Sequence, residues 1–350
     1  MRKNYESLFR CLAEPLYFGF LGDIMNLGFS SPEAGLEKGV SGGEKLTPEE
    51  EGEPENSFEA DDFMPSEEKC FEVLRSLRWS DGVYCPRCGS KKIKDHGEAK
   101  KDYCKRYRCE SCERTFNDLT ETAFAGTHID LREWVYVMNE LSGNTSMNKL
   151  SDRLDRNYRT ITRIRDAMAG ALAKGLLSKL GEEVEIDESY VPAGQKGSKT
   201  EDRPPRKRGL KLRGRGTYEK DEPPIVGAVQ RAGDVVLRVA EDLCNKFVRT
   251  LLGEHAEEGS KVYHDDFSIY NYLPGYNDVT LNHSEGEYVN GEAHTNTIEG
   301  IFSLLKSWLR VFRGVRKDNL WKYLKIFEFD FNHRNLSPFQ KLTNLFGSMI

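Results

Sequence analysis

Two Cys-x-x-Cys pairs constrain the fold of this 350-residue chain more than any other feature of its sequence. Cys85 and Cys88 form the first pair, Cys109 and Cys112 form the second, and 20 residues separate the two pairs. Each pair places two thiolates on one side of a turn, and two such turns provide the four sulfur ligands of a structural zinc ion. We therefore expect a zinc ribbon whose Zn²⁺ is fully enclosed and has no open position for catalysis.

The other cysteines leave one alternative open at this site. Cys104 could act as a fifth thiol or replace Cys109 as a ligand, whereas the remaining cysteines are scattered. The N-terminal residues lack the layout of a signal peptide, and the chain has no run of about 18 uncharged apolar residues. We therefore expect a cytoplasmic protein without a membrane partner, in which the paired cysteines bind metal rather than form disulfides.

Charge is distributed unevenly along the chain. Residues 1–69 contain 16 acidic and six basic side chains, a net of −10, and because the whole chain has a net charge of −6, the rest carries +4. The segment before Glu67 is rich in acids and proline, and it cannot bury enough apolar surface to offset the entropy lost on folding. We expect residues 1–66 to be a disordered extension in front of a mildly basic body, a balance compatible with nucleic-acid binding.

The pattern between residues 126 and 180 predicts helices. Apolar residues recur at helical spacing in three segments, residues 131–141, 147–154 and 158–172. A short helix, a tight turn and a longer helix form the outline of a helix-turn-helix, whose second helix contacts DNA. The alternative is a helical hairpin that serves packing only. The polar and basic residues at the start of the last helix are Arg159, Thr160, Thr162, Arg163 and Arg165, and among them Arg159, Thr160 and Arg163 are our candidates for DNA contacts.

After residue 182 the periodicity changes from helical spacing to a period of two. Val184 and Ile186 alternate with Glu185 and Asp187, which predicts a strand with Asp187 on the side opposite to the apolar residues. A single acid on a strand generally faces solvent, so Asp187 taken alone is a weak candidate for a functional residue.

A hairpin, a helix and another short strand follow. Two apolar segments, residues 224–230 and 235–239, flank a turn and predict the hairpin, and apolar residues in 243–252 predict the helix. Residues 261–265 then predict a strand that ends in the acids Asp265 and Asp266. The order indicates an α/β fold with a mixed sheet flanked by helices.

A basic loop interrupts these elements at residues 193–220. Nine Lys or Arg and two acids lie between Lys196 and Arg215, without apolar periodicity. Such a cationic arm favours a polyanionic partner, with a merely solubilising loop as the alternative. The candidates for DNA contacts in this loop are Arg206, Lys207, Arg208, Lys211 and Arg213.

The segment 283–306 runs from a loop rich in Gly, His and acids into a strongly amphipathic helix. Asn296, Glu299, Ser303 and Lys306 recur at steps of three or four and share one edge of this helix. The alternative interpretation is local, with Asn296 as the N-cap and Glu299 completing a capping box.

Three carboxylates from separate elements are predicted to meet. Asp187 and Asp265 end strands and Glu299 begins a helix, so they can gather in one cleft. Three carboxylates repel one another unless cations bind them, and two Mg²⁺ ions about 4 Å apart are suited to clamping a phosphodiester. Because the ligands are hard oxygens, Mg²⁺ or Mn²⁺ is favoured over zinc at this site.

From about residue 70 to residue 331, the chain resembles the zinc-ribbon DDE transposases of bacterial and archaeal insertion sequences. The motifs behind the resemblance, in chain order, are Cys-Pro-Arg-Cys at 85–88, the helix-turn-helix, Ile-Asp-Glu-Ser-Tyr-Val at 186–191, Pro-Ile-Val-Gly at 224–227, Val-Tyr-His-Asp at 262–265, and above all His-Thr-Asn-Thr-Ile-Glu-Gly at 294–300 with Ser-Leu-Leu-Lys at 303–306. Phe302 stands where this family often has Trp, and His264 stands where Thr is common, but no carboxylate is missing.

The resemblance implies an RNase H-like catalytic domain with Asp187 and Asp265 as the first two catalytic acids. It implies Glu299 as the third, with Asn296 in reserve because members of the family vary at this position, and Lys306 as a contact to DNA phosphate. The implied activity is binding of terminal inverted repeats, metal-dependent strand cleavage and transfer of the 3′-OH end into target DNA. The implied assembly is a homo-oligomer, a dimer or larger, on DNA.

The predicted domains follow from these patterns. They are an acidic extension at 1–66, a zinc ribbon at 67–125, the helix-turn-helix region at 126–180, the catalytic domain at 181–335 with its basic loop, and a C-terminal tail at 336–350. Two rival functions stay open: a DNA-binding regulator without catalysis, and a metal-dependent nuclease that cuts without joining ends.

Overall fold

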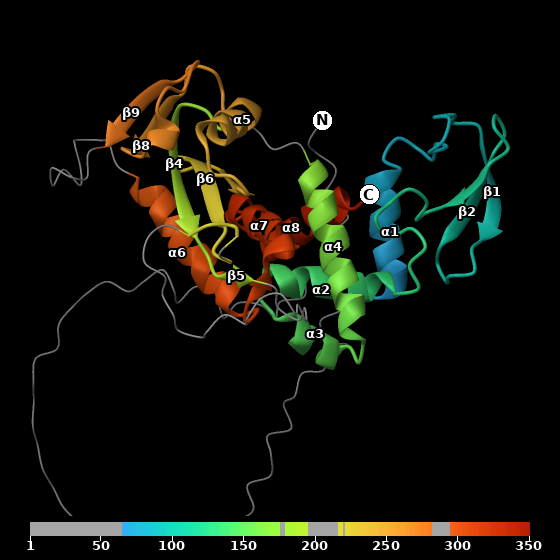
Figure 1. The fold of residues 1–350 in the computed structure, drawn as a ribbon. Coiled ribbons are helices and arrows are strands. Elements are labelled where there is room, and N and C mark those ends of the chain that lie inside the picture. Colours follow the sequence, from blue (N-terminus) through green and yellow to red (C-terminus); the bar gives the residue numbers. More distant parts are fainter. Residues whose placement is uncertain (1–64, 176–178, 195–215, 220, 282–294) are drawn as a thin grey trace, which may run out of the picture. The chain divides into compact units, whose positions relative to one another are not determined.

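The computed structural model describes residues 65–175, 179–194, 216–219, 221–281 and 295–350 (Figure 1). Residues 1–64 of the acidic extension and most of the basic loop predicted from the sequence lie outside the described residues. None of the described helices is long and apolar enough to cross a membrane.

A zinc-ribbon-like unit follows helix α1 (Glu67–Arg78). Strands β1 (Ile93–Glu98), β2 (Lys105–Cys109) and β3 (Thr115–Asn117) form an antiparallel sheet in that order. The side chain of Ser66 accepts a hydrogen bond from the Lys69 N–H and so caps α1. The core of this unit is small and consists of Trp79, Cys85, Tyr107, Cys109 and Phe116.

The three helices predicted between residues 126 and 180 are confirmed as α2 (Leu131–Ser142), α3 (Met147–Arg153) and α4 (Tyr158–Lys174). Each of them contacts the other two. The last residues, which the sequence analysis treated only as a tail, form α8 (Pro338–Ser348) and contact α1, α2 and α4. This helix is anchored because Leu345, Phe346 and Met349 at its C-terminal end are buried.

The second half of the chain builds a five-stranded sheet in the order β7-β6-β4-β8-β9. Its strands are β4 (Glu183–Tyr190), β6 (Pro224–Gln230), β7 (Val235–Val239), β8 (Lys261–Asp265) and β9 (Asn277–Leu281). The first three form an antiparallel meander, and β8 and β9 run parallel to β4 on its other side. This strand order is that of RNase H-like folds, as the resemblance implied.

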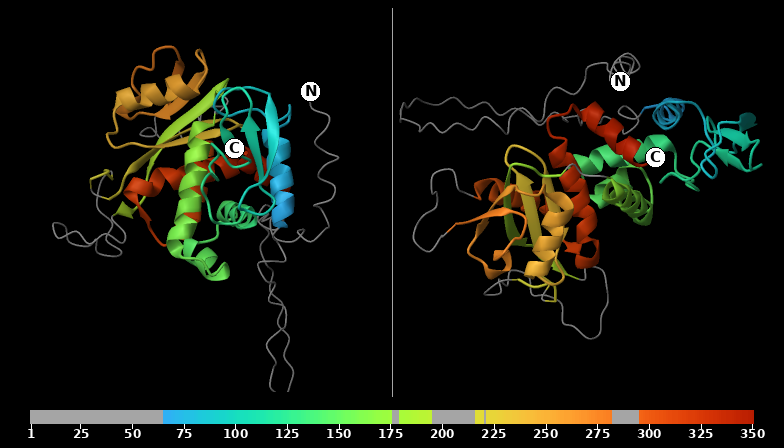
Figure 2. Two further views of the ribbon diagram at one scale, coloured as in Figure 1. Left: turned by 90° about the vertical axis from the view of Figure 1, so that its right-hand side faces the viewer. Right: turned by 90° about the horizontal axis from the view of Figure 1, so that it is seen from above.

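Helices cover both faces of this sheet (Figures 1 and 2). Val184, Ile186 and their neighbours on one face pack against α5 (Asn245–His255) in an apolar cluster. The other face is covered by α6 (Asn296–Arg310), which contacts β4 and β6, and by α7 (Lys317–Asn332), which contacts β7. Alternation along β4 therefore places Glu185 and Asp187 on the α6 face, as the period of two predicted.

A short parallel pair, β5 (Ala193–Gly194) with β10 (Val315–Arg316), joins the segment after β4 to the start of α7. The polar side chains of α7 also bind the edge strand β7. Glu328 accepts the N–H of Leu237, and Asn332 accepts the N–H of Val235. These bonds satisfy backbone donors that an edge strand otherwise leaves open, so α7 closes this edge of the sheet.

Candidate active site

Asp187 and Asp265 lie on neighbouring strands at the same end of the sheet. The parallel strands β4 and β8 pair in a register that sets Glu185 opposite Tyr263. Asp187 and Asp265 each follow two residues later, so both point to the same face, the one covered by α6. The carboxylate of Asp187 accepts the N–H of Glu188 at 2.7 Å, and that of Asp265 accepts the N–H of Phe267 at 3.1 Å.

Helix α6 brings Glu299 to this face. The helix packs closely on β6 because the sheet has a glycine, Gly227, directly beside Asp187 in the pairing of β4 with β6. A Cβ atom at Gly227 would lie 2.7 Å from Ile298 Cδ1 and 3.0 Å from Phe302 Cζ, so a larger residue would have to displace these side chains of α6. Glu299 follows Ile298 directly and lies on the exposed side of the helix.

The pKa of Asp187 responds to the charges of the other two predicted acids. Burial raises the pKa of the Asp187 carboxyl to about 7, and the negative charges of Glu188, Asp265 and Glu299 contribute to the rise. Such effects act over short distances, so Asp187 is close to the other two predicted acids. Their carboxylates are nevertheless spaced too widely to form a compact ligand cluster among the described residues.

Glu188 points to the opposite face and is held there. Its carboxylate accepts the hydroxyl of Tyr270 at 2.7 Å, and burial together with the charges of Glu188, Asp187 and Asp265 raises the pKa of Tyr270 well above its ordinary value. Tyr270 belongs to a single 3₁₀ turn, Ser268–Tyr270, that follows Asp265. The hydrogen bond therefore ties the ends of β4 and β8 together behind the site.

The remaining predicted residues of α6 lie on its exposed side. Asn296, Ser303 and Lys306 are solvent-exposed, as Glu299 is, and they follow the steps of three and four expected of one helix edge. The capping interpretation was wrong, because the N-cap is Thr295, and Asn296 is the first residue of the helix proper. Glu299 accepts the Thr295 hydroxyl at 3.4 Å, a long hydrogen bond.

The predicted zinc ligands converge in the ribbon. The Cys85 and Cys112 sulfurs are 3.6 Å apart, as are those of Cys88 and Cys109, and all four lie within 4.8 Å of one another. Four Zn–S bonds of about 2.3 Å in a tetrahedron require sulfurs about 3.8 Å apart, so the arrangement fits one zinc ion. Cys104 is buried outside this group, and burial raises the pKa of its thiol to about 11, so the alternative with Cys104 is wrong.

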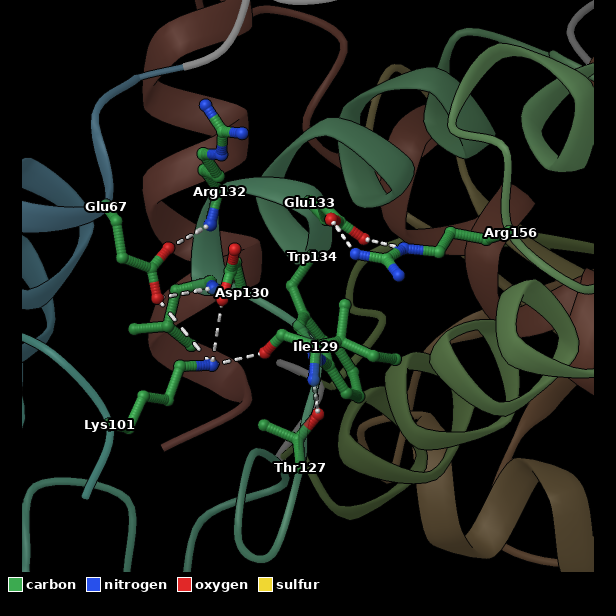
Figure 3. A network of polar contacts seen from close by, with 10 residues as sticks. Glu67, Lys101, Thr127, Ile129, Asp130, Arg132, Glu133, Trp134 and Arg156 are labelled. Carbon is green, nitrogen blue, oxygen red and sulfur yellow. Dashed lines mark hydrogen bonds and ion pairs between the residues drawn. The ribbon is translucent and has the colours of Figure 1, made fainter. Parts of the chain in front are cut away.

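Helix α2 is fixed to both α1 and the turn between α3 and α4 (Figure 3). The carboxylate of Glu67 accepts the backbone N–H groups of Leu131 and Arg132, the first two residues of α2, at 2.9 Å each. Glu133 forms a two-pronged ion pair with Arg156 in the turn between α3 and α4. These contacts hold the turn and the start of α4 in place against α2.

The basic residues of α4 divide into two groups. Arg159 and Arg163 are exposed one turn apart near the start of the helix, and Thr160 is half-buried beside them. Arg165 is only 4% exposed. Its guanidinium binds Asp166 at 2.5 Å and the Tyr323 hydroxyl at 2.9 Å, so the expectation that it shares the polar face was wrong. Helical periodicity turns residue 165 towards α7 instead.

The predicted DNA contacts of the basic loop, Arg206, Lys207, Arg208, Lys211 and Arg213, lie outside the described residues. Sequence reasoning missed Glu185 and Gly227, which support the site from inside the sheet. The alternation along β4 placed Glu185 on the same face as Asp187, but an acid in that pattern does not reveal whether it is buried.

The comparisons with known proteins point to transposases. Residues 65–115 match the transposase zinc-ribbon domain, and residues 179–332 match the ISXO2-like transposase domain. An uncharacterized protein in transposable element ISH50 of Halobacterium salinarum is 38% identical over 268 residues, which cover 75% of this chain and 90% of that protein. These matches support an enzyme of the transposase and nuclease class.

The chain belongs to the family of zinc-ribbon transposases of insertion sequences with an ISXO2-like domain. Among solved structures, it is similar at 11% identity to the Mos1 mariner paired end complex with Mn (TM-score 0.19, 57% of this chain and 77% of that chain). It is similar at the same identity to a pre-cleavage Mos1 transpososome (TM-score 0.20, 81% and 99%). TM-scores this low support no structural assignment, so the fold class rests on the strand order.

Proposed function

We propose that this transposase binds the terminal inverted repeats of its insertion sequence, cuts the DNA at its ends and joins the freed 3′-OH to target DNA. The observation behind the proposal is the half-buried carboxyl of Asp187, whose pKa is raised to about 7 beside the negative charges of Asp265 and Glu299. Repulsion between acids at the end of a sheet has no structural benefit, whereas a divalent cation would neutralise them.

Asp187, Asp265 and Glu299 would hold Mg²⁺ or Mn²⁺, because oxygen donors suit these hard cations and the repulsion around Asp187 gives a cation a place to bind. When bound, two such cations stabilise the charge that develops on the attacking and leaving oxygens at phosphorus. Asn296, one turn before Glu299, is the reserve for the third position. The N–H of Glu188 fixes the orientation of the Asp187 carboxylate.

The remaining predicted residues bind DNA in this proposal. Lys306 lies two turns after Glu299 on the same exposed helix edge, so it reaches a phosphate near the cut. Arg159, Thr160 and Arg163 at the start of α4 contact the inverted repeat, and the zinc ribbon, held by one structural Zn²⁺, adds to this binding. The basic loop with Arg206, Lys207, Arg208, Lys211 and Arg213 guides flanking or target strands. A homo-oligomer brings two element ends together.

A strand-transfer assay tests the proposal. The full chain is mixed with labelled element ends, a plasmid target and Mg²⁺, alongside Asp187→Ala, Asp265→Ala and Glu299→Ala. We expect joined product from the wild type and none from the three variants. Activity that survives only in Glu299→Ala would transfer the third role to Asn296.

Two other outcomes separate the rival functions. Cleavage without joining would identify a metal-dependent nuclease. Tight binding of the ends without cleavage in Mg²⁺ or Mn²⁺ would overturn the enzymatic proposal and leave a DNA-binding protein.

A further inference from the structure

Glu185 is a fully buried acid on the same face of β4 as Asp187, and its side chain is 0% exposed. One carboxylate oxygen accepts the backbone N–H of Thr297 at 2.9 Å and that of Ile298 at 3.1 Å. The other accepts the Thr297 hydroxyl and the Nε–H of Arg231, each at 2.9 Å. A strand in the middle of the sheet thus binds the first turn of a helix more than 100 residues further along the chain.

These bonds replace the usual N-terminal cap of α6. Thr295, at the N-cap position, makes no capping hydrogen bond with its side chain, so the helix depends on Glu185 to accept the free N–H groups of its first turn. The negative charge also lies at the positive end of the helix dipole. Arg231 balances the charge, and a second carboxylate, Glu183, binds the same guanidinium at 2.8 Å.

Glu185 is poorly suited to binding a metal itself. Both of its oxygens already accept two hydrogen bonds, so a cation would have to displace donors from a site closed to solvent. Its effect on the site must therefore act through the elements that it joins. Those elements are β4, which bears Asp187 two residues later, and α6, which bears Glu299 directly after Ile298.

We infer that Glu185 is a positioning residue that fixes the first turn of α6 to β4, so that Glu299 is held facing Asp187. The inference rests on the proposed function. Asp187 lies about 6.6 Å along the strand from Glu185, and Glu299 lies about 1.5 Å along the helix axis from Ile298. Gly227, which pairs with Asp187 from the neighbouring strand β6, lets α6 lie close to the sheet. Helix α6 is therefore held to the sheet at two places near the acids, at Glu185 and at Gly227.

The variant Glu185→Gln tests this inference with nearly unchanged side-chain volume. An amide keeps one oxygen, but its NH₂ group faces N–H and O–H donors, so half of the bonds to α6 and Arg231 are lost. Glu183→Gln is the matched control. Glu183 also lies on β4 and also binds Arg231, but its other partners are Tyr263 and Lys261, and none of these bonds involves α6.

The measurements are Mn²⁺ binding to the full chain by titration calorimetry, thermal unfolding, and DNA cleavage. We expect Glu185→Gln to weaken Mn²⁺ binding about 10- to 100-fold, as the loss of a group that orients metal ligands does. Cleavage should fall about 100-fold, because a displacement of about 1 Å is enough for such a loss. Glu183→Gln should bind Mn²⁺ and cleave DNA like the wild type, even if its unfolding temperature falls.

Each outcome bears on a different claim. A folded Glu185→Gln variant that binds Mn²⁺ and cleaves like the wild type would overturn the positioning role. If Glu183→Gln loses Mn²⁺ binding equally, the effect comes from Arg231 and the positioning role is again wrong. If Glu185→Gln does not fold, Thr297→Val replaces it, because this change removes only the hydroxyl donor, and unchanged Mn²⁺ binding would then refute the inference. A wild type that neither binds Mn²⁺ nor cleaves DNA refutes the proposed function itself.

Discussion

Replacing Asp187 by Asn should stabilise this protein at neutral and alkaline pH while abolishing its activity. The pKa of the Asp187 carboxyl is about 7 in the fold, above its ordinary value of 3.8, chiefly because of burial. The folded protein therefore holds this proton more tightly than the unfolded chain does, and the fold loses stability as the pH rises from about 4 to about 7. Asn is neutral at every pH and keeps the oxygen that accepts the Glu188 N–H.

The size of the effect follows from that pKa difference. It amounts to about 3 pH units, each worth about 1.4 kcal/mol, which gives an upper bound of about 4 kcal/mol above pH 7. Because the carboxyl is partly exposed and solvent screens its charge, we expect about 2 kcal/mol. In a unit of this size, that is a rise of about 4 °C in the unfolding temperature.

The assay is thermal unfolding of the full chain in buffer without added Mg²⁺ or Mn²⁺, at pH 8 and at pH 4. Asp187→Asn should unfold about 4 °C above the wild type at pH 8 and at the same temperature at pH 4. Asp266→Asn is the control, since this neighbouring acid is exposed and its replacement should change little at either pH. An equal shift of Asp187→Asn at both pH values, or none at pH 8, would refute the reasoning.

Three further predictions test the ribbon, the seat of α6 and the recognition helix. Cys85→Ser should abolish the protection of the ribbon amides against hydrogen exchange, because two of the zinc ligands belong to the small ribbon core. The amides of the five-stranded sheet should stay protected. Full protection of the ribbon amides in the variant would contradict a structural zinc. Gly227→Ala should reduce DNA cleavage about 100-fold, because its Cβ would collide with the side chains of Ile298 and Phe302 on α6. Gly253→Ala, whose Cβ meets open space in α5, should leave cleavage unchanged, and equal activity of the two variants would show that the close contact is not needed. Arg163→Ala should weaken DNA binding, measured by filter binding, and lower its salt dependence by about one phosphate contact. Arg165→Ala should mainly lower the unfolding temperature, measured by calorimetry, because Arg165 is buried and binds Tyr323. The reverse pattern would contradict the division of the α4 arginines.

Local patterns in the sequence were sufficient to predict most elements of this fold. The helices α2 to α6, the β6–β7 hairpin and the strands that end near Asp187 and Asp265 follow from periodicity and turn chemistry, which neighbouring residues set. The four zinc ligands follow from their spacing because two close pairs of thiolates have few other uses. The protein family could be predicted for the same reason, because the motifs that resemble it are short and contiguous in the sequence.

Only the tertiary structure could decide which polar side chains are buried and what they bind. Glu185 and Asp187 have the same place in the alternation of β4, yet one accepts four hydrogen bonds inside the sheet and the other lies with Asp265 and Glu299 at its end. Arg163 and Arg165 likewise differ because α7 covers one side of α4 and not the other. Sequence determines the face on which a residue lies. The partners of that residue come from elements far away along the chain. The packing of these elements sets the burial and the charge balance of each side chain, and therefore its role.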